Sequence, residues 1–135
     1  MKYLIGVDLG TSGTKTVLFD TSGNVIASKT VEYPMYQPQN GWAEQDPLDW
    51  YNAAVETIKY VSSKVDAADI AGLGISGQMH GLVMLDENGD VIRPSIIWCD
   101  QRTGEECEDI TRLVGKERLI EITANPALTG FTASK

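Results

Sequence analysis

Residues 8–15 read Asp-Leu-Gly-Thr-Ser-Gly-Thr-Lys, and they combine the residue types that hold a phosphate group. Glycines let backbone N–H groups turn toward an anion, hydroxyls add neutral donors, and Lys15 adds a positive charge. Asp8 is suited to hold Mg²⁺, directly or through water, because Mg²⁺ prefers oxygen ligands and keeps several of its waters. The spacing is not that of a Walker A loop, which needs G-x-x-x-x-G-K-[ST]. A hydrophilic hairpin turn without a ligand explains the same composition and stays open as an alternative.

A second polar cluster, residues 76–81, reads Ser-Gly-Gln-Met-His-Gly and follows an apolar run. Gln78 and His80 offer amide and imidazole groups between glycines, which is a lining suited to a neutral polar ligand such as a sugar. The alternative is that His80 is a turn or core histidine whose hydrogen bonds are satisfied inside the protein. No partner residue marks His80 as a nucleophile or base.

A third cluster, residues 98–102, reads Trp-Cys-Asp-Gln-Arg. Asp100 and Arg102 could bond to sugar hydroxyls. They could equally mark the start of a helix, with Asp100 near its N-cap and Arg102 on the surface.

Two other patterns indicate functions that we exclude. Residues 72–77 match G-x-G-x-x-G, but a helical pattern precedes them, whereas a dinucleotide site needs a strand before the first glycine and a helix after the last. Cys99 and Cys107 with the single histidine do not make a zinc site. They form no disulfide framework, so the cytoplasm is the expected compartment.

Hydrophobic periodicity predicts the elements that position these clusters. Apolar runs predict an antiparallel meander over residues 3–31, and Tyr51, Ala54, Ile58 and Val61 predict one face of a helix that begins at Pro47 and ends near Lys64. The later elements are a buried strand (70–76), a hairpin (82–92), a short strand (95–98) and a helix from Thr103. This order predicts an α/β fold with a mixed sheet. All three clusters follow strand ends, which in open α/β sheets converge on one crevice.

The charge and hydropathy of the chain exclude some classes of binding partner. The chain has 11 basic and 19 acidic residues, a net charge of −8, which argues against nucleic acid or an anionic membrane as the main partner. No stretch approaches the roughly 20 apolar residues of a membrane span, and Asp8 interrupts the apolar run near the N-terminus. We therefore expect a soluble protein whose ligands are small molecules.

Five segments together resemble one known family, the FGGY carbohydrate kinases, and within it the xylulokinases. They are IGVDLGTSGTK (5–15), GWAEQDP (41–47), GISGQMHGLVML (74–85), IIWCDQR (96–102) and GFTASK (130–135). The resemblance covers essentially the whole chain, in the same order. It implies the ribonuclease H-like domain of the actin-like ATPases, with a mixed sheet and flanking helices. It also implies a reaction in which ATP and D-xylulose give ADP and D-xylulose 5-phosphate with Mg²⁺.

The resemblance also implies roles for individual residues. Asp8 would lie near Mg²⁺ and the transferred phosphoryl group. The implied phosphate loop contains Thr11, Ser12, Gly13 and Lys15. The implied sugar-binding residues are Gln78, Met79 and His80, and Asp100 and Arg102 would line or support the same cleft.

Family members are several-fold longer and have a second domain of like fold. The resemblance therefore implies that residues 1–135 are the N-terminal part of the first domain. The second domain and the aspartate that serves as general base would lie outside this chain, which alone would be inactive. We further expect an apolar surface that could favour a homodimer. The alternatives are an FGGY kinase for another ketose, alditol or sugar acid, and a non-catalytic sugar- or nucleotide-binding module.

Overall fold

Strand β1 (Tyr3–Leu9) organises a four-stranded sheet in the computed structural model, which describes all of residues 1–135. It pairs antiparallel with β2 (Gly13–Asp20), and β2 pairs antiparallel with β3 (Val25–Glu32). This confirms the predicted meander. Strand β5 (Ile70–Gly77) joins the other side of β1 in parallel, which gives the order β3-β2-β1-β5. The sheet is therefore mixed, as predicted.

The chain divides into two compact units, which we describe separately. Residues 1–34 and 47–78 form the sheet unit, and residues 35–46 and 79–135 form the helical unit. The sheet unit contains β1, β2, β3 and β5, helix α1 (Pro47–Ser62) and a short 3₁₀ turn at Ala67–Asp69.

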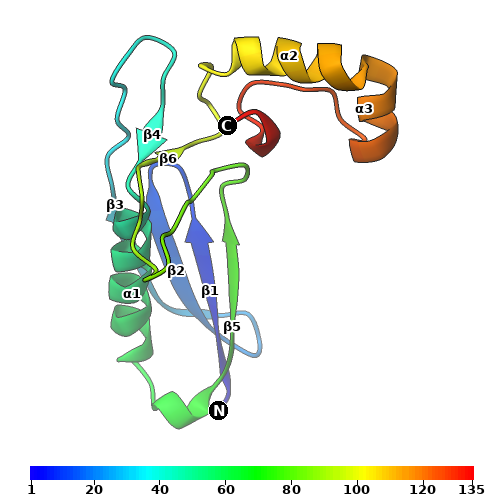
Figure 1. Cartoon of the computed structure of the whole chain (residues 1–135). Helices are drawn as coiled ribbons and strands as arrows, with labels where there is room; N and C mark the ends of the chain where they lie inside the picture. The colour runs from blue at the N-terminus through cyan, green and yellow to red at the C-terminus, as the bar shows by residue number, and fades with distance from the viewer. The chain divides into compact units, whose positions relative to one another are not determined.

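Helix α1 covers one face of the sheet and packs mainly on β2 and β3 (Figure 1). The core lies between them and centres on Ile5, Val7, Leu18 and Val61, each at most 5% exposed. Because the buried Ile5 and Val7 alternate with less buried neighbours along β1, this strand turns one face to α1 and leaves Asp8 on the other. The hydrophobic core thus fixes the orientation of Asp8.

The predicted buried face of α1 is wrong in part. Val61 is buried and Ile58 packs against the core, as predicted, but Tyr51 is 67% exposed. The helix also buries Ala53 and Thr57, which with Val61 are spaced four residues apart. Thr16 of β2 donates a hydrogen bond to the hydroxyl of Thr57 (2.7 Å), and Thr57 donates to the carbonyl of Ala53 (2.8 Å). Buried hydroxyls are tolerated when they are paired in this way. Apolar periodicity alone could not find a helix face that contains a threonine.

Strand β5 was predicted to be buried, and this is also wrong. It forms the edge of the sheet, and its Leu73 and Ile75 side chains are 46% and 66% exposed. The reason is that α1 packs on the opposite half of the sheet. An apolar run therefore identified the strand but not its environment.

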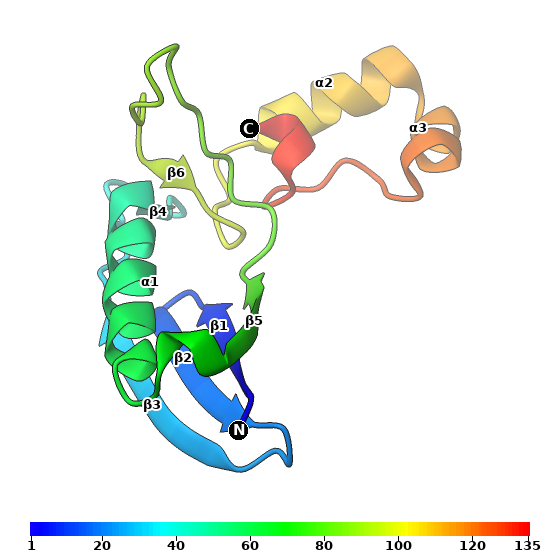
Figure 2. The same cartoon turned by 90° about the horizontal axis from the view of Figure 1, so that it is seen from below.

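The helical unit has little strand structure. β4 (Glu44–Gln45) pairs antiparallel with β6 (Ser95–Ile96), and the predicted hairpin at 82–92 is reduced to a bridge between Leu85 and Val91. Helix α2 (Gly104–Val114) is followed by α3 (Lys116–Thr123) and a 3₁₀ turn at Thr132–Ser134 (Figure 2). Gly115, at φ +87°, separates the two helices. The helices of this protein are all too short or too polar to cross a membrane.

Candidate functional site

Asp8 lies at the carboxyl end of β1, on the sheet face that α1 does not cover. Its cross-strand partner on β2 is Lys15, and its register partner on β5 is Ser76. These three residues line a shallow hollow of about 540 Å³ together with Gly6 and Gly74, which have no side chains to fill it. Asp8, Lys15 and Ser76 are all exposed. A carboxylate, an ammonium group and a hydroxyl therefore meet beside open space.

The loop from Gly10 to Gly13 turns tightly between β1 and β2. The N–H of Gly10 donates to the carbonyl of Gly13 (3.0 Å), and the carbonyl of Ser12 accepts from the N–H of Tyr33 (3.3 Å). A Cβ on Gly13 would lie only 2.7 Å from the carbonyl oxygen of Val31. The glycine thus lets β3 approach the loop closely, and the exposed Ser12 is left at the tip of the turn.

Tyr33 anchors this loop by a hydrogen bond, a function that the sequence did not predict. Its hydroxyl donates to the carbonyl of Gly10 (2.5 Å) and accepts from the hydroxyl of Thr14 (3.4 Å). Burial raises the pKa of Tyr33, and the nearby charge of Asp8 raises the pKa further, while the Thr14 hydrogen bond opposes both. The group therefore remains a neutral donor, which suits a residue that anchors a carbonyl. The only signal was an aromatic residue directly after a strand, in a segment that read as irregular.

The end of β5 closes the other side of the loop. The N–H of Gln78 donates to the carbonyl of Leu9 (2.8 Å), and the hydroxyl of Thr11 donates to Oε1 of Gln78 (3.4 Å). A Cβ on Gly77 would lie 2.9 Å from the Cβ of Leu9, so glycine is required for this approach. Gln78 thus joins the residues of the phosphate-type loop in the sheet unit, and its predicted sugar contact stays a prediction.

The packing of Gly13 yields a stability prediction. Gly13→Ala should lower the free energy of unfolding by about 1–3 kcal/mol, because the new methyl group meets backbone atoms that cannot rotate away. Gly74→Ala is the matched control, since a Cβ there meets nothing within 4 Å and should change stability by less than about 0.5 kcal/mol. Urea unfolding curves of both variants make the comparison. Equal midpoints would show that the loop does not depend on this close approach.

Asp100 and Arg102 form the centre of a buried ionic network in the helical unit. Arg102 Nη2 lies 2.7 Å from Asp100 Oδ2, and Arg102 Nη1 lies 2.7 Å from Glu44 Oε1. The N–H of Ala43 also donates to Asp100 Oδ2 (2.6 Å), and Arg93 donates to Glu44 (3.0 Å). Asp100 is 1% exposed. The network ties together two chain segments that are more than 40 residues apart in the sequence.

The hydrogen bonds of Asp100 and Arg102 keep the Asp100 carboxyl group ionised, which fits a structural function for this ion pair. Burial alone would raise the pKa of Asp100, but hydrogen bonds from Arg102 and Ala43 outweigh it, so the pKa lies below its ordinary value. The guanidinium group of Arg102 also stacks 3.7 Å above the ring of Trp42. Since both side chains are committed to partners in the helical unit, this geometry favours a structural function over direct contact with a sugar.

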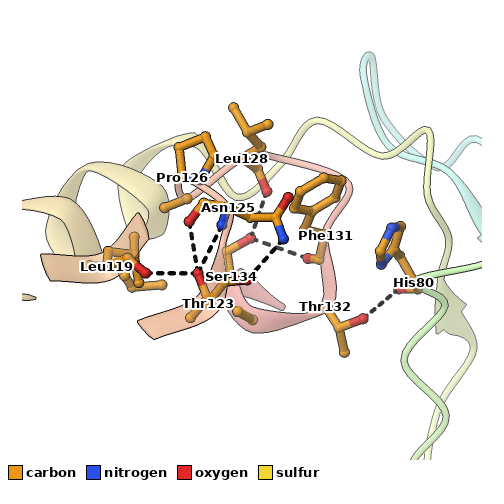
Figure 3. Close-up of a pocket in the computed structure, with 12 residues that line it drawn as sticks. His80, Leu119, Thr123, Asn125, Pro126, Leu128, Phe131, Thr132 and Ser134 are labelled. Carbon is orange, nitrogen blue, oxygen red and sulfur yellow. Dashed lines mark hydrogen bonds between the residues drawn. The ribbon is translucent and has the colours of Figure 1, made fainter. Parts of the chain in front are cut away.

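Met79 and His80 lie at the start of the helical unit and differ in their surroundings. The side chain of Met79 is 71% exposed. His80 has φ +65°, a conformation that residues other than glycine rarely adopt, and its ring lies 4.5 Å from the ring of Phe131 (Figure 3). His80, Phe131 and Leu119 are among the residues that line a mostly apolar cavity of about 290 Å³ in this unit. The predicted sugar contacts of Met79 and His80 stay predictions.

The side chains of the loop at residues 8–15 are of the types that bind an anion together with a hydrated cation. The exposed ammonium group of Lys15 and the exposed hydroxyl of Ser12 suit phosphate oxygens. No group of three or more His, Cys, Asp or Glu side chains could hold a metal on its own. A single exposed carboxylate fits Mg²⁺ that arrives with a phosphate ligand and keeps most of its water.

Comparison with known proteins agrees with this fold. The model of the N-terminal domain of the FGGY family of carbohydrate kinases matches residues 3–135. Xylulose kinase of Bacillus subtilis is 46% identical over 137 aligned positions, which cover 100% of this chain and 27% of that protein. The crystal structure described as a xyloylose kinase from Brucella ovis superposes with a TM-score of 0.85 at 36% identity, over 98% of this chain and 28% of the other.

A gluconate kinase structure from Lactobacillus acidophilus is also similar, with a TM-score of 0.80 at 34% identity, over 89% of this chain and 24% of that one. The chain spans about a quarter of the length of each of these relatives. The family match nevertheless extends over almost every residue described above, from Asp8 to Lys135. The chain belongs to the FGGY family of carbohydrate kinases, whose N-terminal domain it matches.

Proposed function

We propose that the complete gene product transfers the γ-phosphoryl group of MgATP to a hydroxyl group of D-xylulose, giving D-xylulose 5-phosphate and ADP. The single observation that carries the proposal is the Asp8 loop: an exposed carboxylate whose register partner on β2 is the exposed Lys15, beside a tight glycine turn with the exposed hydroxyl of Ser12 at its tip. The identity of 46% to a xylulose kinase supports D-xylulose as the acceptor.

In this proposal, the residues of the sheet unit handle the phosphates. Thr11, Ser12, Gly13 and Lys15 bind the phosphate oxygens, and Tyr33 keeps their loop in place through Gly10. Asp8 would hold Mg²⁺, whose charge offsets the negative charge that spreads over the phosphoryl oxygens. Phosphoryl transfer depends mostly on positioning and electrostatic stabilisation, so a rigid loop suits it.

The acceptor side involves the helical unit and residues beyond this chain. Gln78, Met79 and His80, which are consecutive in the sequence, would contact the sugar, and the Asp100–Arg102 pair would have a supporting role. The sugar oxygen attacks the γ-phosphorus, the bond to the ADP oxygen breaks, and the hydroxyl proton passes to a base. The family resemblance assigns that base to an aspartate of another part of the complete gene product. We infer that residues 1–135 form part of the first of two domains, and that the chain alone releases no ADP above background.

A second candidate is phosphorylation of a different acceptor, such as a sugar acid, and the similarity to a gluconate kinase favours considering it. The test is to compare kcat/KM of the complete gene product for D-xylulose, D-gluconate and glycerol. We expect D-xylulose to exceed both by at least about a hundredfold, because buried polar groups left unpaired by the wrong substrate are costly. A higher value for D-gluconate would keep the kinase chemistry and replace the acceptor.

A further inference from the structure

The carbonyl oxygen of His80 has two donors from the C-terminal segment of the helical unit. Lys135 Nζ lies 2.7 Å from this oxygen, and the hydroxyl of Thr132 donates to it at 3.3 Å. On the side-chain side, the imidazole ring packs against Phe131 (Figure 3). Residues 131–135 therefore contact both the backbone and the ring of one residue.

His80 needs such contacts because of its backbone conformation. With φ +65° it lies in the left-handed region, which carries an energetic cost for a residue with a Cβ. Such conformations persist only where the surroundings enforce them, and they are concentrated at functional sites. The carbonyl direction of His80, and with it the path of the chain at Met79, depends on what holds this conformation.

Lys135 is the strongest of these contacts. Its ammonium group donates a second hydrogen bond to the carbonyl of Gly130 (2.7 Å), so it links the Gly130 turn to His80. Gly130 itself, at φ +83°, could not be another residue, because a Cβ there would collide with the carbonyl of Trp98. Burial lowers the pKa of Lys135, and the negative charge of Asp100 partly opposes this effect. By donating to both carbonyls, the ammonium group of Lys135 holds the backbone at His80 and at Gly130 in place.

We propose that Lys135 is a positioning residue that locks His80 in its left-handed conformation and thereby shapes the acceptor-binding surface formed by Met79 and His80. The second half of this statement rests on the proposed function. The first half concerns the fold of the chain alone. Lys135 itself is not expected to touch the sugar or the phosphates.

The first half can be tested by NMR, because His80 is the only histidine of the 135-residue chain. Labelling with ¹³C,¹⁵N-histidine gives a single set of backbone signals, whose Cα and Cβ shifts report the φ angle. We expect left-handed shifts in the wild type, a move toward extended values in Lys135→Ala, and retention in Lys135→Arg, which keeps a charged donor. Thr132→Val should have a smaller effect, since its hydrogen bond is longer. Unchanged shifts in Lys135→Ala, or extended shifts in the wild type, would overturn the proposal.

The second half is tested by kinetics of the complete gene product. Lys135→Ala should raise the KM for the sugar about tenfold, the size expected for one charged hydrogen bond, and leave the KM for MgATP within about twofold. Lys135→Arg should recover part of the loss. Lys116→Ala, a change of an exposed lysine on α3, is the matched control and should have no effect. Equal changes in both KM values would point to general disruption and overturn the positioning role.

The two experiments separate the possible failures. If the wild type phosphorylates no sugar, the proposed function fails, while the histidine signals still decide whether Lys135 locks His80. If the wild type is active and the variant matches it, the positioning role fails and the proposed function stands.

Discussion

Asp8→Asn in the complete gene product should lower kcat by at least about a hundredfold, while the KM for the sugar changes less than about threefold. The substitution keeps the shape of the side chain but removes the negative charge that faces Lys15 at the end of β1. Removal of one group that stabilises transition-state charge typically costs two to three orders of magnitude in kcat. A loss confined to kcat identifies an interaction made in the transition state rather than in sugar binding.

The control for this experiment removes a charge from the same unit away from the loop. Glu56 lies on α1 with its side chain 59% exposed, so Glu56→Gln should leave both kinetic constants unchanged. The assay is steady-state ADP formation over a range of sugar and MgATP concentrations. A kcat of Asp8→Asn close to that of the wild type would remove Asp8 from the mechanism.

Asp100→Asn should destabilise the protein by about 3 kcal/mol at pH 7. Asp100 is 1% exposed and accepts hydrogen bonds from Arg102 and from the N–H of Ala43. Removing one partner of a buried ion pair leaves the other charge uncompensated, which typically costs about 3–5 kcal/mol. We place the value at the lower end, because Arg102 keeps its bond to Glu44. Urea unfolding followed by tryptophan fluorescence measures the loss, with Trp42 as a probe next to Arg102.

The effect should depend on pH in a defined direction. Because the pKa of Asp100 in the folded protein lies below its ordinary value of 3.8, its contribution is complete above that pH and is lost as the pH falls through the folded value. The stability difference between wild type and Asp100→Asn should therefore shrink in acid. Asp109→Asn, which breaks an exposed pair with Arg112, should cost less than about 1 kcal/mol at pH 7. Similar losses for both variants would contradict the central place of the Asp100 network.

The sequence predicted the elements whose structure depends on residues close together in the chain. The meander over β1–β3 and the start of α1 were found because alternating apolar residues and a proline at the first helical position determine them within a few residues. The turn within the predicted hairpin at 82–92 also forms, and in it the carboxylate of Asp86 accepts from the N–H groups of Asn88 and Asp90. The loop at Asp8 belongs to this group as well.

Two of the missed features, the interactions of Tyr33 and of Glu44, depend on contacts between distant parts of the chain. Tyr33 anchors Gly10 across 23 positions, and Glu44 binds Arg102 across 58. Neither partner carries a local signal of its function. Helix α3 was missed for a different reason: it has eight residues, too few to show a clear period. Such features can be read only after the fold has brought the segments together.

The most direct test of the central claim is the formation of ADP by the complete gene product with MgATP, measured with and without D-xylulose. We predict ADP release that depends on D-xylulose, with one D-xylulose 5-phosphate formed per ADP. Release of ADP at the same rate without any sugar, or no release with any sugar tried, would contradict the assignment of the Asp8 loop to sugar phosphorylation.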